Sequence, residues 1–544
     1  MTGQGKSSLA PFRYPDFRLL WTATLVSNLG VLIQGVGAAW GMTEMTSSPQ
    51  MVSLVQASVT FPIMLLAMLA GAISDNFDRR TVMLLAQIFM LLVSVALTLI
   101  TWTGNLGPWG LLACTFLLGA GTAFHLPAWQ SSMRDLVPRD DLPAAVTLNS
   151  MSFNLMRSVG PVVGGAIVVL AGLTMVFALN AVSYFAVIYA LIRWKPPREE
   201  QELPAERLGS AVWAGVRYIS FSTGLMRIML RTFMFSVSAV SVIALLPIIA
   251  RNQLQGDATT YGLLLGLFGA GAILGALGGS QLRARFPMEM IITISFVGFA
   301  TACILLALAT DFLLAVPGLV LAGASWVTAF SHFNVSTQLG APRWVVGRAL
   351  SIYQTLVFGG QAIGAFVWGA VSGFWSLPVA LLVSAGALLG GALFGRIIPV
   401  PGLTDNNLDP ANRFNIPALN LDLKPRSGPI VISIAWTIPK ANTEAFLDLM
   451  AERRRIRRRD GAAQWILQRD LENPDTWVET YRVATWTEYI RHNRRRTAHD
   501  AQNHDQLALL HQGPEPPLVR RRIERPVGRH SRDLPDIVPP SEFR

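Results

Sequence analysis

Charged residues are scarce in this chain. Only 14% of its 544 residues are Asp, Glu, Lys or Arg and 52% are hydrophobic, whereas a soluble domain carries roughly a quarter charged residues. Apolar runs of about 20 residues recur through the first three quarters of the sequence, and each is long enough to cross roughly 30 Å of bilayer hydrocarbon. This excludes an ordinary soluble enzyme and predicts a polytopic membrane protein.

Cysteines are few, and the sequence contains no P-loop. The two cysteines, Cys114 and Cys303, both lie in apolar runs, so neither a disulfide framework nor a zinc site is expected. No P-loop motif occurs, so we expect an ion gradient rather than ATP to supply energy, and no cofactor. The polar N-terminus leads into the first apolar span without a small-residue cleavage pattern, so that span is expected to direct insertion itself.

Hydropathy predicts twelve membrane-spanning helices. Their expected ranges are 17–42, 50–73, 81–102, 109–130, 144–171, 174–194, 228–250, 260–282, 288–309, 312–336, 347–371 and 376–397. A longer polar stretch from Arg193 to about Thr223 separates the sixth span from the seventh. The expected organisation is an N-terminal six-helix bundle at 1–195, a cytoplasmic inter-bundle loop at 196–227 and a second six-helix bundle at 228–398.

The two bundles are related in sequence. A constant shift of 204 positions, without a gap, superimposes several small and charged residues. The matched pairs are Gly71 with Gly275, Arg79 with Arg283, Gly119 with Gly323, Pro138-Arg139 with Pro342-Arg343, Gly160 with Gly364 and Gly165 with Gly369. Parallel six-helix repeats place a substrate cavity on the axis between the halves, where one half can rock against the other.

Basic residues are distributed unequally between the two sides of the predicted membrane. One set of loops carries almost all of them: Arg79, Arg80, Arg134, Arg139, Arg193, Lys195, Arg198, Arg207, Arg283, Arg285, Arg343 and Arg396, with Lys6 and Arg13 near the start. The opposite loops contribute essentially Arg251. The positive-inside rule therefore predicts a multi-pass protein with both termini in the cytoplasm.

The composition changes after Pro399. Residues 399–427 predict a linker, and residues 428–526 predict a small soluble domain. Its expected elements are a strand from Pro429 to Thr437, a helix from Asn442 to about Asp460, strands near 463–471 and 476–486, a helical region from about 488 to 511 and a short strand at 518–524. This βαββαβ order is the ferredoxin-like arrangement. Residues 527–544 are expected to be disordered.

A glycine, an aspartate and a basic pair follow one another where the second span meets the cytoplasm. The segment Gly71-Ala-Ile-Ser-Asp75-Asn-Phe-Asp78-Arg79-Arg80 resembles motif A of the major facilitator superfamily. Asp75 can accept a helix N-terminus or pair with an Arg, and with Arg79 and Arg80 it would hold the two halves shut on the cytoplasmic face. The alternative is a solvated turn with positive-inside arginines.

A glycine-rich motif lies in the predicted fifth span. Gly160-Pro161-Val-Val-Gly164-Gly165 resembles motif C of exporter-type members of the superfamily. Glycines four residues apart allow close helix contact, and Pro161 removes a backbone donor, so that the helix can bend. Motif C implies a role in setting the direction of transport, and small-residue packing alone is the alternative.

Arg157 is the principal candidate for a residue of the cavity. It lies one turn before motif C, and a central arginine costs at least ~2.5 kcal/mol on insertion scales, so an interior partner or an anionic substrate is expected. The alternative is an arginine that reaches back to the cytoplasmic surface. Further polar candidates for the cavity are Asn28, Gln34, His125, Asn149, Asn154, His332, Gln354 and Gln361, each of which could instead form a helix–helix hydrogen bond.

No Asp or Glu lies in the middle of a predicted span. Glu44, Asp257 and Asp311 are at span ends, and Gly30 is followed by Val31, where many members of the resembling subfamily have a carboxylate. A carboxylate for proton coupling is therefore not identified, and proton antiport is implied by the resemblance alone.

The stretch from Phe124 to Gly165, above all Asp135-Leu-Val-Pro-Arg139-Asp-Asp141-Leu-Pro-Ala-Ala-Val-Thr-Leu-Asn149, narrows the resemblance. It is similar to the enterobactin-exporter and macrolide-efflux-like branch, also called transmembrane secretion effectors. The C-terminal domain, through Tyr481-Arg-Val-Ala-Thr-Trp486-Thr-Glu-Tyr-Ile-Arg-His492, resembles dimeric α/β barrels of the antibiotic-biosynthesis-monooxygenase kind. His492, His499 and Trp465 could be pocket residues, although surface or core positions are the expectation.

The arginine runs of the C-terminal domain, 453–455, 457–459, 494–496 and 520–522, are interrupted by acidic residues. We therefore expect a solvated face or attraction to anionic lipid rather than nucleic acid. The domain could also form a homodimer.

The sequence as a whole predicts an all-α polytopic transporter with an α+β soluble domain. We expect it to export a small organic molecule such as a siderophore, an antibiotic or a drug-like compound by alternating access. The alternatives are a membrane-anchored enzyme, in which the C-terminal domain oxidises a lipophilic compound, and an importer on the same fold.

Overall fold

A computed structural model of the chain describes residues 9–138, 140–195, 208–342, 344–400, 408–411, 413–424 and 426–525. It falls into two compact units, each composed of several chain segments. The first contains Met1–Leu208, Arg227–Val335 and Leu350–Gly402, and the second contains Gly209–Met226, Ser336–Ala349 and Leu403–Arg544. The predicted disordered tail, 527–544, lies outside the described residues.

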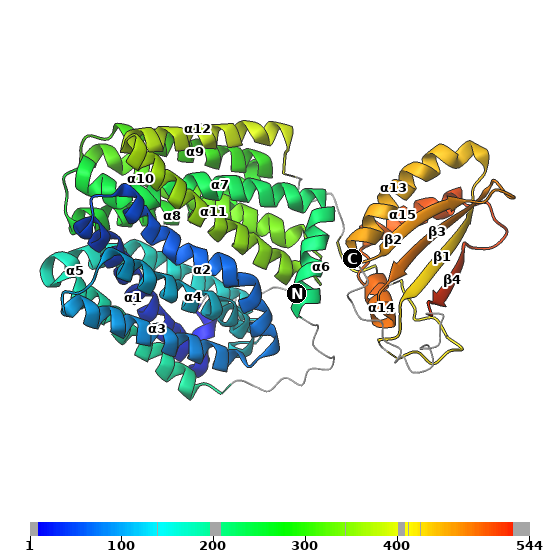
Figure 1. Cartoon of the computed structure of the whole chain (residues 1–544), viewed down its shortest axis with the longest axis horizontal. Coiled ribbons are helices and arrows are strands. Elements are labelled where there is room, and N and C mark those ends of the chain that lie inside the picture. The colour runs from blue at the N-terminus through cyan, green and yellow to red at the C-terminus, as the bar shows by residue number, and fades with distance from the viewer. Residues whose placement is uncertain are drawn as a thin grey trace. The chain divides into compact units, whose positions relative to one another are not determined.

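The first unit consists of long helices (Figure 1). They are α1 (Pro15–Met45), α2 (Pro49–Asn76), α3 (Arg79–Trp102), α4 (Pro108–Leu136), α5 (Leu142–Arg193), α7 (Thr223–Ile248), α8 (Ala258–Arg285), α9 (Met288–Leu308), α10 (Phe312–Leu339), α11 (Val346–Phe374) and α12 (Leu377–Ile397), with short helical turns η1 (Ala10–Arg13) and η2 (Ile249–Gln253). Within the described residues, eleven helices are long and apolar enough to cross a membrane. The prediction of a polytopic helical membrane protein is confirmed.

Helix α5 is much longer than one crossing requires. It has 52 residues, which corresponds to about 78 Å at 1.5 Å per residue. Gly172 interrupts it with φ 76° and ψ 176°, a left-handed φ that glycine adopts without a steric cost. The sequence predicts two spans here, on either side of this residue.

Helix α3 shows how the first unit meets lipid. Leu85, Leu92 and Leu99 are each more than half exposed, whereas Met83 and Met90 are buried. The two sets each recur every seven residues, so they occupy different faces of the same helix. A helix that is apolar on both its exposed and its buried face is suited to a hydrocarbon environment rather than to water.

The second unit contains the C-terminal domain, a four-stranded antiparallel sheet with helices. Its elements are β1 (Ile430–Thr437), η3 (Lys440–Asn442), α13 (Thr443–Arg459), β2 (Ala463–Arg469), β3 (Thr476–Val483), α14 (Trp486–Arg494), α15 (Ala498–Leu510) and β4 (Leu518–Ile523). The strand order is β2-β3-β1-β4. In the central strand, Ile430 pairs with Val483 of β3 and with Ile523 of β4.

Alternation in β1 directs one face of this sheet into the core. Ile430, Ile432, Ile434 and Trp436 are buried, and the residues between them are half-buried. The helices supply the opposing side chains, among them Phe446, Met450 and Leu507. This is the face that the sequence pattern predicts.

The second unit also includes a helix that the sequence analysis did not predict. Helix α6 (Leu208–Phe221) lies in what was expected to be a polar stretch. Its apolar positions recur at helical spacing, so that Ala214 and Tyr218 are buried while Trp213 is exposed. Tyr218 packs edge-on against Trp344 with ring centroids 5.3 Å apart, and the Arg459 guanidinium lies 4.9 Å from the Tyr218 ring centre.

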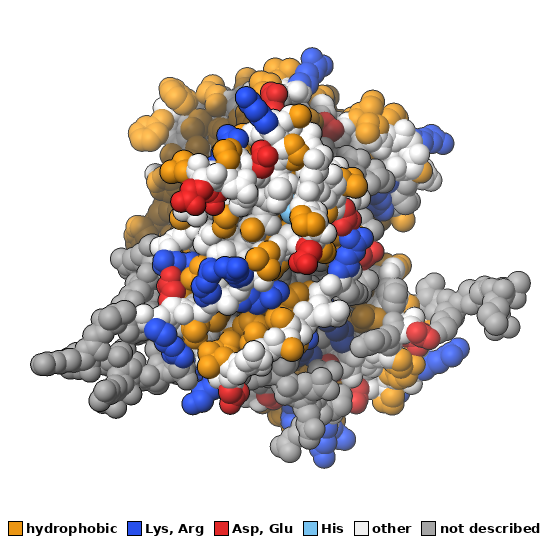
Figure 2. Space-filling view, turned by 90° about the vertical axis from the view of Figure 1, so that its right-hand side faces the viewer, with side chains coloured by type: hydrophobic (Ala, Val, Ile, Leu, Met, Phe, Trp, Pro, Cys, Tyr) orange, Lys and Arg blue, Asp and Glu red, His pale blue; other side chains and the backbone are white. Residues whose placement is uncertain are grey.

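The expectation for the arginine runs is wrong for Arg453 and Arg457. These residues are 4% and 2% exposed and both bind Glu479, which is itself fully buried. Their i, i+4 spacing on α13 places both on the face that packs against the sheet. The shared carboxylate and cation–π contacts with Trp436 and Tyr481 offset the cost of burying the two charges. Elsewhere, basic and acidic side chains are interspersed on the surface seen in Figure 2.

Candidate functional site

Motif C forms the contact between the two related bundles of the first unit. A Cβ at Gly165 of α5 would meet the carbonyl oxygen of Ala258 in α8 and the backbone of Gly262, and a Cβ at Gly262 would meet the carbonyl of Pro161. The Ser158 hydroxyl donates to the Gly266 carbonyl across the same seam at 3.3 Å. The helices therefore approach backbone to backbone, which small residues permit.

The other glycines of the motif face helix α1. A Cβ at Gly160 would meet Leu32, and one at Gly164 would meet the backbone of Ile33. One turn of α5 thus packs against its own bundle through these two positions and against the second bundle through Gly165.

The second bundle repeats this arrangement at the positions given by the 204-residue shift. A Cβ at Gly364 of α11 would meet the Val237 carbonyl in α7, and a Cβ at Gly369 would meet Ser53 in α2. Contacts of α5 with α1 and α8 therefore have counterparts in contacts of α11 with α7 and α2. The sequence repeat corresponds to a repeat in packing.

Arg157 reaches from the first bundle into the second. Its guanidinium carbon lies 5.5 Å from the centre of the Phe268 ring in α8 and 5.8 Å from that of Trp326 in α10. Among the described residues no carboxylate forms an ion pair with it. Cation–π contact with two rings stabilises the charge in part and leaves its hydrogen-bonding capacity for another group.

An aromatic cluster in the second bundle surrounds these rings, and the sequence analysis did not single it out. Trp326 packs edge-on against Phe330 at 4.8 Å between centroids, and Phe330 packs in the same way against Phe235 at 5.4 Å. Phe299 adjoins Trp326 at 6.2 Å. The spacing of four residues between Trp326 and Phe330 was the available signal, because it places both rings on one face of a helix.

Several other candidates are engaged within one bundle. The side-chain oxygen Oε1 of Gln34 accepts a 2.6 Å hydrogen bond from Nδ2 of Asn180. Nδ1 of His125 lies 3.3 Å from Nε2 of Gln87, and the Asn154 side chain donates to the Ser150 backbone carbonyl at 2.9 Å.

The remaining candidates lie in α1, α5, α10 and α11. Asn149 accepts from Trp129, and His332 bonds the Thr328 carbonyl. Gln361 is buried, whereas Asn28 and Gln354 are half-buried. Of the predicted cavity residues, Arg157 alone is shown here in contact with the opposite bundle.

The two arginines of motif A make their described contacts inside the first bundle. Arg79 forms a 2.9 Å ion pair with Asp135 of α4, and Arg80 donates to the carbonyls of Leu191 and Ile192 at the end of α5. These bonds tie α3 to its own neighbours, so they do not join the two halves as the sequence analysis expected.

The acidic members of motif A have different positions. Asp78 caps the N-terminus of α3 by accepting from the Thr81 backbone N–H and hydroxyl. A Cβ at Gly71 would lie 3.4 Å from the Ser351 hydroxyl oxygen of α11, so this end of α2 meets the second bundle. The side chain of Asp75 lies outside the described residues.

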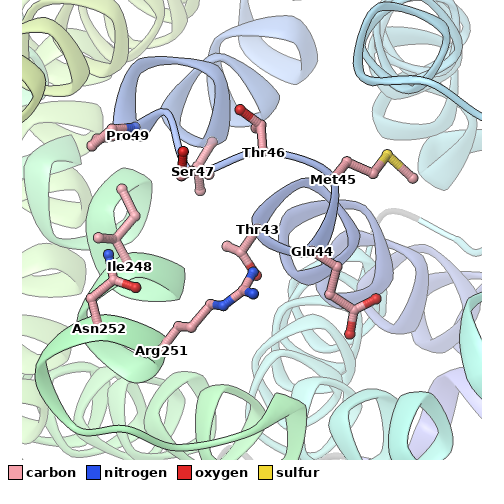
Figure 3. A pocket seen from close by; sticks show the side chains of 10 residues that line it. Thr43, Glu44, Met45, Thr46, Ser47, Pro49, Ile248, Arg251 and Asn252 are labelled. Carbon is pink, nitrogen blue, oxygen red and sulfur yellow. The ribbon is translucent and has the colours of Figure 1, made fainter.

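A pocket of about 340 Å³ lies between the turn joining α1 to α2 and the end of α7 (Figure 3). Arg251 and Asn252 of η2 line one side, and Thr43, Glu44 and Ser47 line the other. In Figure 3 the Arg251 guanidinium points toward Thr43. The Glu44 carboxylate turns away and accepts a 2.8 Å hydrogen bond from the Trp40 indole. Arg251, the basic residue predicted on the side of the membrane opposite the cytoplasm, and Glu44, at the end of the first predicted span, therefore line the same pocket.

A buried ion pair braces the second bundle and was also missed. Arg231 of α7 is fully buried and lies 3.1 Å from a carboxylate oxygen of Glu289 in α9. It also donates to the Gly391 carbonyl of α12 at 2.8 Å. Both residues occur within a few residues of predicted span boundaries, which made them look like ordinary interfacial charges.

Among the described residues, no group of three or more His, Cys, Asp or Glu side chains could hold a metal ion.

The arrangement of long helices matches that of membrane transporters of known structure. A peptide-transporter-family protein in complex with 5-aminolevulinic acid has a TM-score of 0.60 at 11% identity, covering 72% of this chain and 97% of that one. The nucleoside transporter NupG gives 0.58 at 12% identity, covering 70% and 100%. The helical part of the chain therefore has the fold of these transporters.

The chain belongs to the transmembrane secretion effector family, whose sequence profile matches residues 6–527. It is also similar to enterobactin exporters named EntS. The protein of Escherichia coli O1:K1 / APEC is 27% identical over 383 residues, which is 69% of this chain and 89% of the relative. That of Citrobacter koseri is 27% identical over 412 residues, covering 71% and 95%. The resemblance inferred from the sequence motifs is confirmed, and the chain is a multi-pass transporter of an export-type family.

Proposed function

We propose that this protein exports a small, oxygen-rich or anionic organic molecule across the bacterial inner membrane by alternating access. The seam between the two related bundles binds the cargo. Both termini are cytoplasmic, and α5 crosses the membrane twice by turning at Gly172, which gives twelve spans. The strand order and helix placement of the C-terminal domain favour a ferredoxin-like fold, and its dimerisation stays a prediction.

One observation supports the cargo chemistry above the others. Arg157 crosses the seam, contacts two aromatic rings and has no carboxylate partner among the described residues. A guanidinium offers five N–H donors to oxygen acceptors, and the surrounding rings favour an aromatic or apolar body. Enterobactin, from the name of the relatives, is the first compound to test.

Uptake into everted membrane vesicles tests this proposal. Vesicles containing the protein are expected to accumulate enterobactin when energised, and a macrolide and a cationic dye serve as comparison compounds. Replacing Arg157 by Gln removes charge-assisted hydrogen bonds worth about 1.5–3 kcal/mol, which corresponds to roughly 10- to 100-fold weaker binding. Arg157→Lys should retain part of the activity, and Arg18→Gln, at an exposed position of α1, is the matched control.

Transport unaffected by Arg157→Gln would remove the assigned cargo site. Accumulation in right-side-out vesicles instead of everted ones would indicate import.

We also propose that a proton gradient drives export, because the chain lacks a P-loop and belongs to this superfamily. A protonophore should then abolish uptake while ATP removal, with the gradient maintained, should not.

A further inference from the structure

A cavity of about 350 Å³ lies within the C-terminal domain. Helices α13 and α15 line it, together with Ala411, Arg413 and Phe414. Their segment is held in place by backbone hydrogen bonds, from Ala411 to the Arg496 carbonyl at 3.0 Å and from Ala498 to the Asp409 carbonyl at 2.8 Å. Residues that precede the domain in sequence therefore line one side of the cavity.

Four arginines and two aspartates line this cavity. The two aspartates already have cationic partners: Asp505 pairs with Arg413 at 2.9 Å, and Asp500 pairs with Arg459, which is outside the lining, at 2.7 Å. Arg459 also pairs with Asp460 at 2.9 Å, so the Arg459–Asp460–Asp500 group has one negative charge in excess.

Two of those arginines share one carboxylate. Glu479 accepts from Arg453 at 2.6 Å and from Arg457 at 3.2 Å. Arg457 also donates to Nε2 of His492, whose Nδ1 faces the Asp460 carbonyl at 3.3 Å. Donation to Nε2 requires a neutral imidazole, so His492 adds no charge, and the Arg453–Arg457–Glu479 group has one positive charge in excess.

Arg496 adds a second positive charge. Its one described hydrogen bond goes to the amide oxygen of Asn493 at 2.6 Å, and no carboxylate among the described residues pairs with it. Burial, together with Arg457, lowers the pKa of Arg496 to about 10. Burial, together with Arg453 and Arg496, lowers the pKa of His504 in the cavity wall to about 4. With the excess negative charge of the Arg459–Asp460–Asp500 group included, the side chains in and around the cavity keep one net positive charge.

Asn503 supplies a second, independent indication of a ligand. Its Nδ2 donates to the Leu449 carbonyl at 3.0 Å, which fixes the orientation of the amide. Its Oδ1 is buried and has no hydrogen-bond partner in the part of the chain that the structure describes. A buried acceptor without a donor is costly. Asn503 lines the cavity, so a ligand that donates a hydrogen bond could satisfy it.

We propose that this cavity binds a small organic anion that also carries a hydrogen-bond donor, such as a hydroxylated aromatic carboxylate. Arg496, with the Arg453–Arg457 pair behind it, binds the carboxylate, and Asn503 accepts from the hydroxyl. Phe414, Ile456 and Ala501 supply an apolar wall for the body of the ligand. This site is separate from the seam at Arg157 and does not depend on the transport proposal.

Calorimetric titration of the full-length protein in lipid nanodiscs tests the site. The probe is 4-hydroxybenzoate, and three related compounds each lack one feature: benzoate lacks the hydroxyl, 4-hydroxybenzamide lacks the charge, and inorganic phosphate lacks the apolar body. We expect saturable binding of 4-hydroxybenzoate. Loss of the charge should weaken binding at least about 10-fold and loss of the hydroxyl several-fold, and phosphate should bind more weakly than 4-hydroxybenzoate.

Variants assign the binding to this cavity. Arg496→Gln should weaken binding at least about 10-fold, and Ala501→Trp, which fills the space but keeps every charge, should also abolish it. Arg494→Gln, an exposed neighbour with the same change in charge, should have no effect.

Any of four results would overturn the proposal. The first two are binding of the neutral amide, or of phosphate, as tight as that of 4-hydroxybenzoate. The third is loss of 4-hydroxybenzoate binding in Arg157→Gln but not in Arg496→Gln. The fourth is no detectable binding of 4-hydroxybenzoate up to on the order of 10 mM. Because the comparison among ligands uses the unmodified protein, it remains decisive if a variant fails to fold.

Discussion

The two bundles of the membrane unit share their packing but not their chemistry. Gly165 and Gly369, related by the 204-residue shift, both allow a close crossing to the opposite bundle. Arg157, by contrast, has Gln361 as its counterpart, and the rings of Phe268 and Trp326 correspond to Met64 and Thr122. The duplicated residues maintain the helix packing, and the residues present in only one bundle give the seam its polarity, to which we assign cargo recognition in the proposed function.

The charged contacts differ in the same way. Arg79 pairs with Asp135 in the first bundle, whereas Arg283 corresponds to Arg79 and Leu339 to Asp135 in the second. Conversely, the buried Arg231–Glu289 pair of the second bundle has Ser27 and Leu85 as counterparts. Each bundle is therefore braced by ion pairs at different places, which gives the two halves different electrostatic environments on a common frame.

The largest expected effect comes from breaking the shared packing. Gly165→Leu and Gly369→Leu should each reduce export to background, because a side chain at either position meets the opposite bundle and overpacking costs about 1–3 kcal/mol. Vesicle uptake at matched protein levels measures the effect. Gly386→Leu, at a position with open space around it, is the control, and full activity in both seam variants would show that the close crossings are dispensable.

Removing the cation of the buried pair in the second bundle should destabilise the membrane unit. In Arg231→Met the Glu289 carboxylate loses its partner, and breaking a buried pair costs about 3–5 kcal/mol; with Glu289 partly exposed, the lower end is expected. The thermal unfolding midpoint in detergent reports the change. The double variant Arg231→Met/Glu289→Gln should recover part of the loss, and equal stability of single variant and parent would contradict the bracing role.

The buried carboxylate of the C-terminal domain offers a contrast with Glu289, because it binds two arginines instead of one. The Arg453 and Arg457 guanidinium groups outweigh the cost of burial and lower the pKa of Glu479 to about 2. Because the pKa is lowered by folding, this contribution to stability is complete above the ordinary value of about 4.5 and is lost as the pH falls toward 2.

Tryptophan fluorescence of the full chain between pH 5 and 2 tests this pH dependence. A drop of roughly 3 kcal/mol in the stability of the C-terminal domain is expected over this range. In Glu479→Gln the dependence should be flatter and the stability lower throughout. A parent domain whose stability does not change over the same range would refute the assignment.

Exchanging Arg157 and its counterpart Gln361 tests whether export depends on the difference between the two bundles. The double variant Arg157→Gln/Gln361→Arg moves the cation to the other half, where Met64 and Thr122 replace the aromatic partners. We expect export to remain about 10-fold or more below that of the parent. Restoration of export in this variant would mean that the position of the charge is unimportant.

The smallest effect is expected at the ion pair of motif A. Asp135→Asn should lower the unfolding free energy by at most about 1 kcal/mol, because Arg79 is about one-third exposed. At the equivalent position, Leu339→Asn removes no ion pair and should not show the salt-dependent part of the change. Thermal unfolding at low and high ionic strength distinguishes the two variants. Identical salt dependence in Asp135→Asn and Leu339→Asn would contradict a stabilising role of the Arg79–Asp135 ion pair.

Most of the membrane architecture could be predicted from the sequence, because long apolar runs have few alternatives to spanning a bilayer. The predicted 81–102 and 288–309 lie within a few residues of α3 and α9. Helix α6 was missed, because hydropathy over the whole inter-bundle stretch is dominated by its polar first half. The burial of Arg453 and Arg457 was missed because it depends on Glu479, a residue distant in sequence that pairing in the sheet brings into place.

The candidate site was predictable only in part. Arg157 stood out because charge in an apolar helix is costly, and motif C stood out by its glycine spacing. The aromatic partners could not be found in this way, because Phe and Trp are ordinary residues in a membrane helix and only the crossing of α5 with α8 brings them to Arg157. For Arg79 and Arg80, nothing in the sequence distinguishes partners within the bundle from partners across the seam.

Crosslinking the two bundles at the pocket of Figure 3 tests the central claim most directly. Ser47→Cys and Asn252→Cys, in a background with Cys114→Ser and Cys303→Ser, place one thiol on each bundle. If the halves rock about the seam, a short bifunctional thiol reagent should abolish export, and cleaving the crosslink should restore it. Full export from completely crosslinked protein would contradict alternating access between these two bundles.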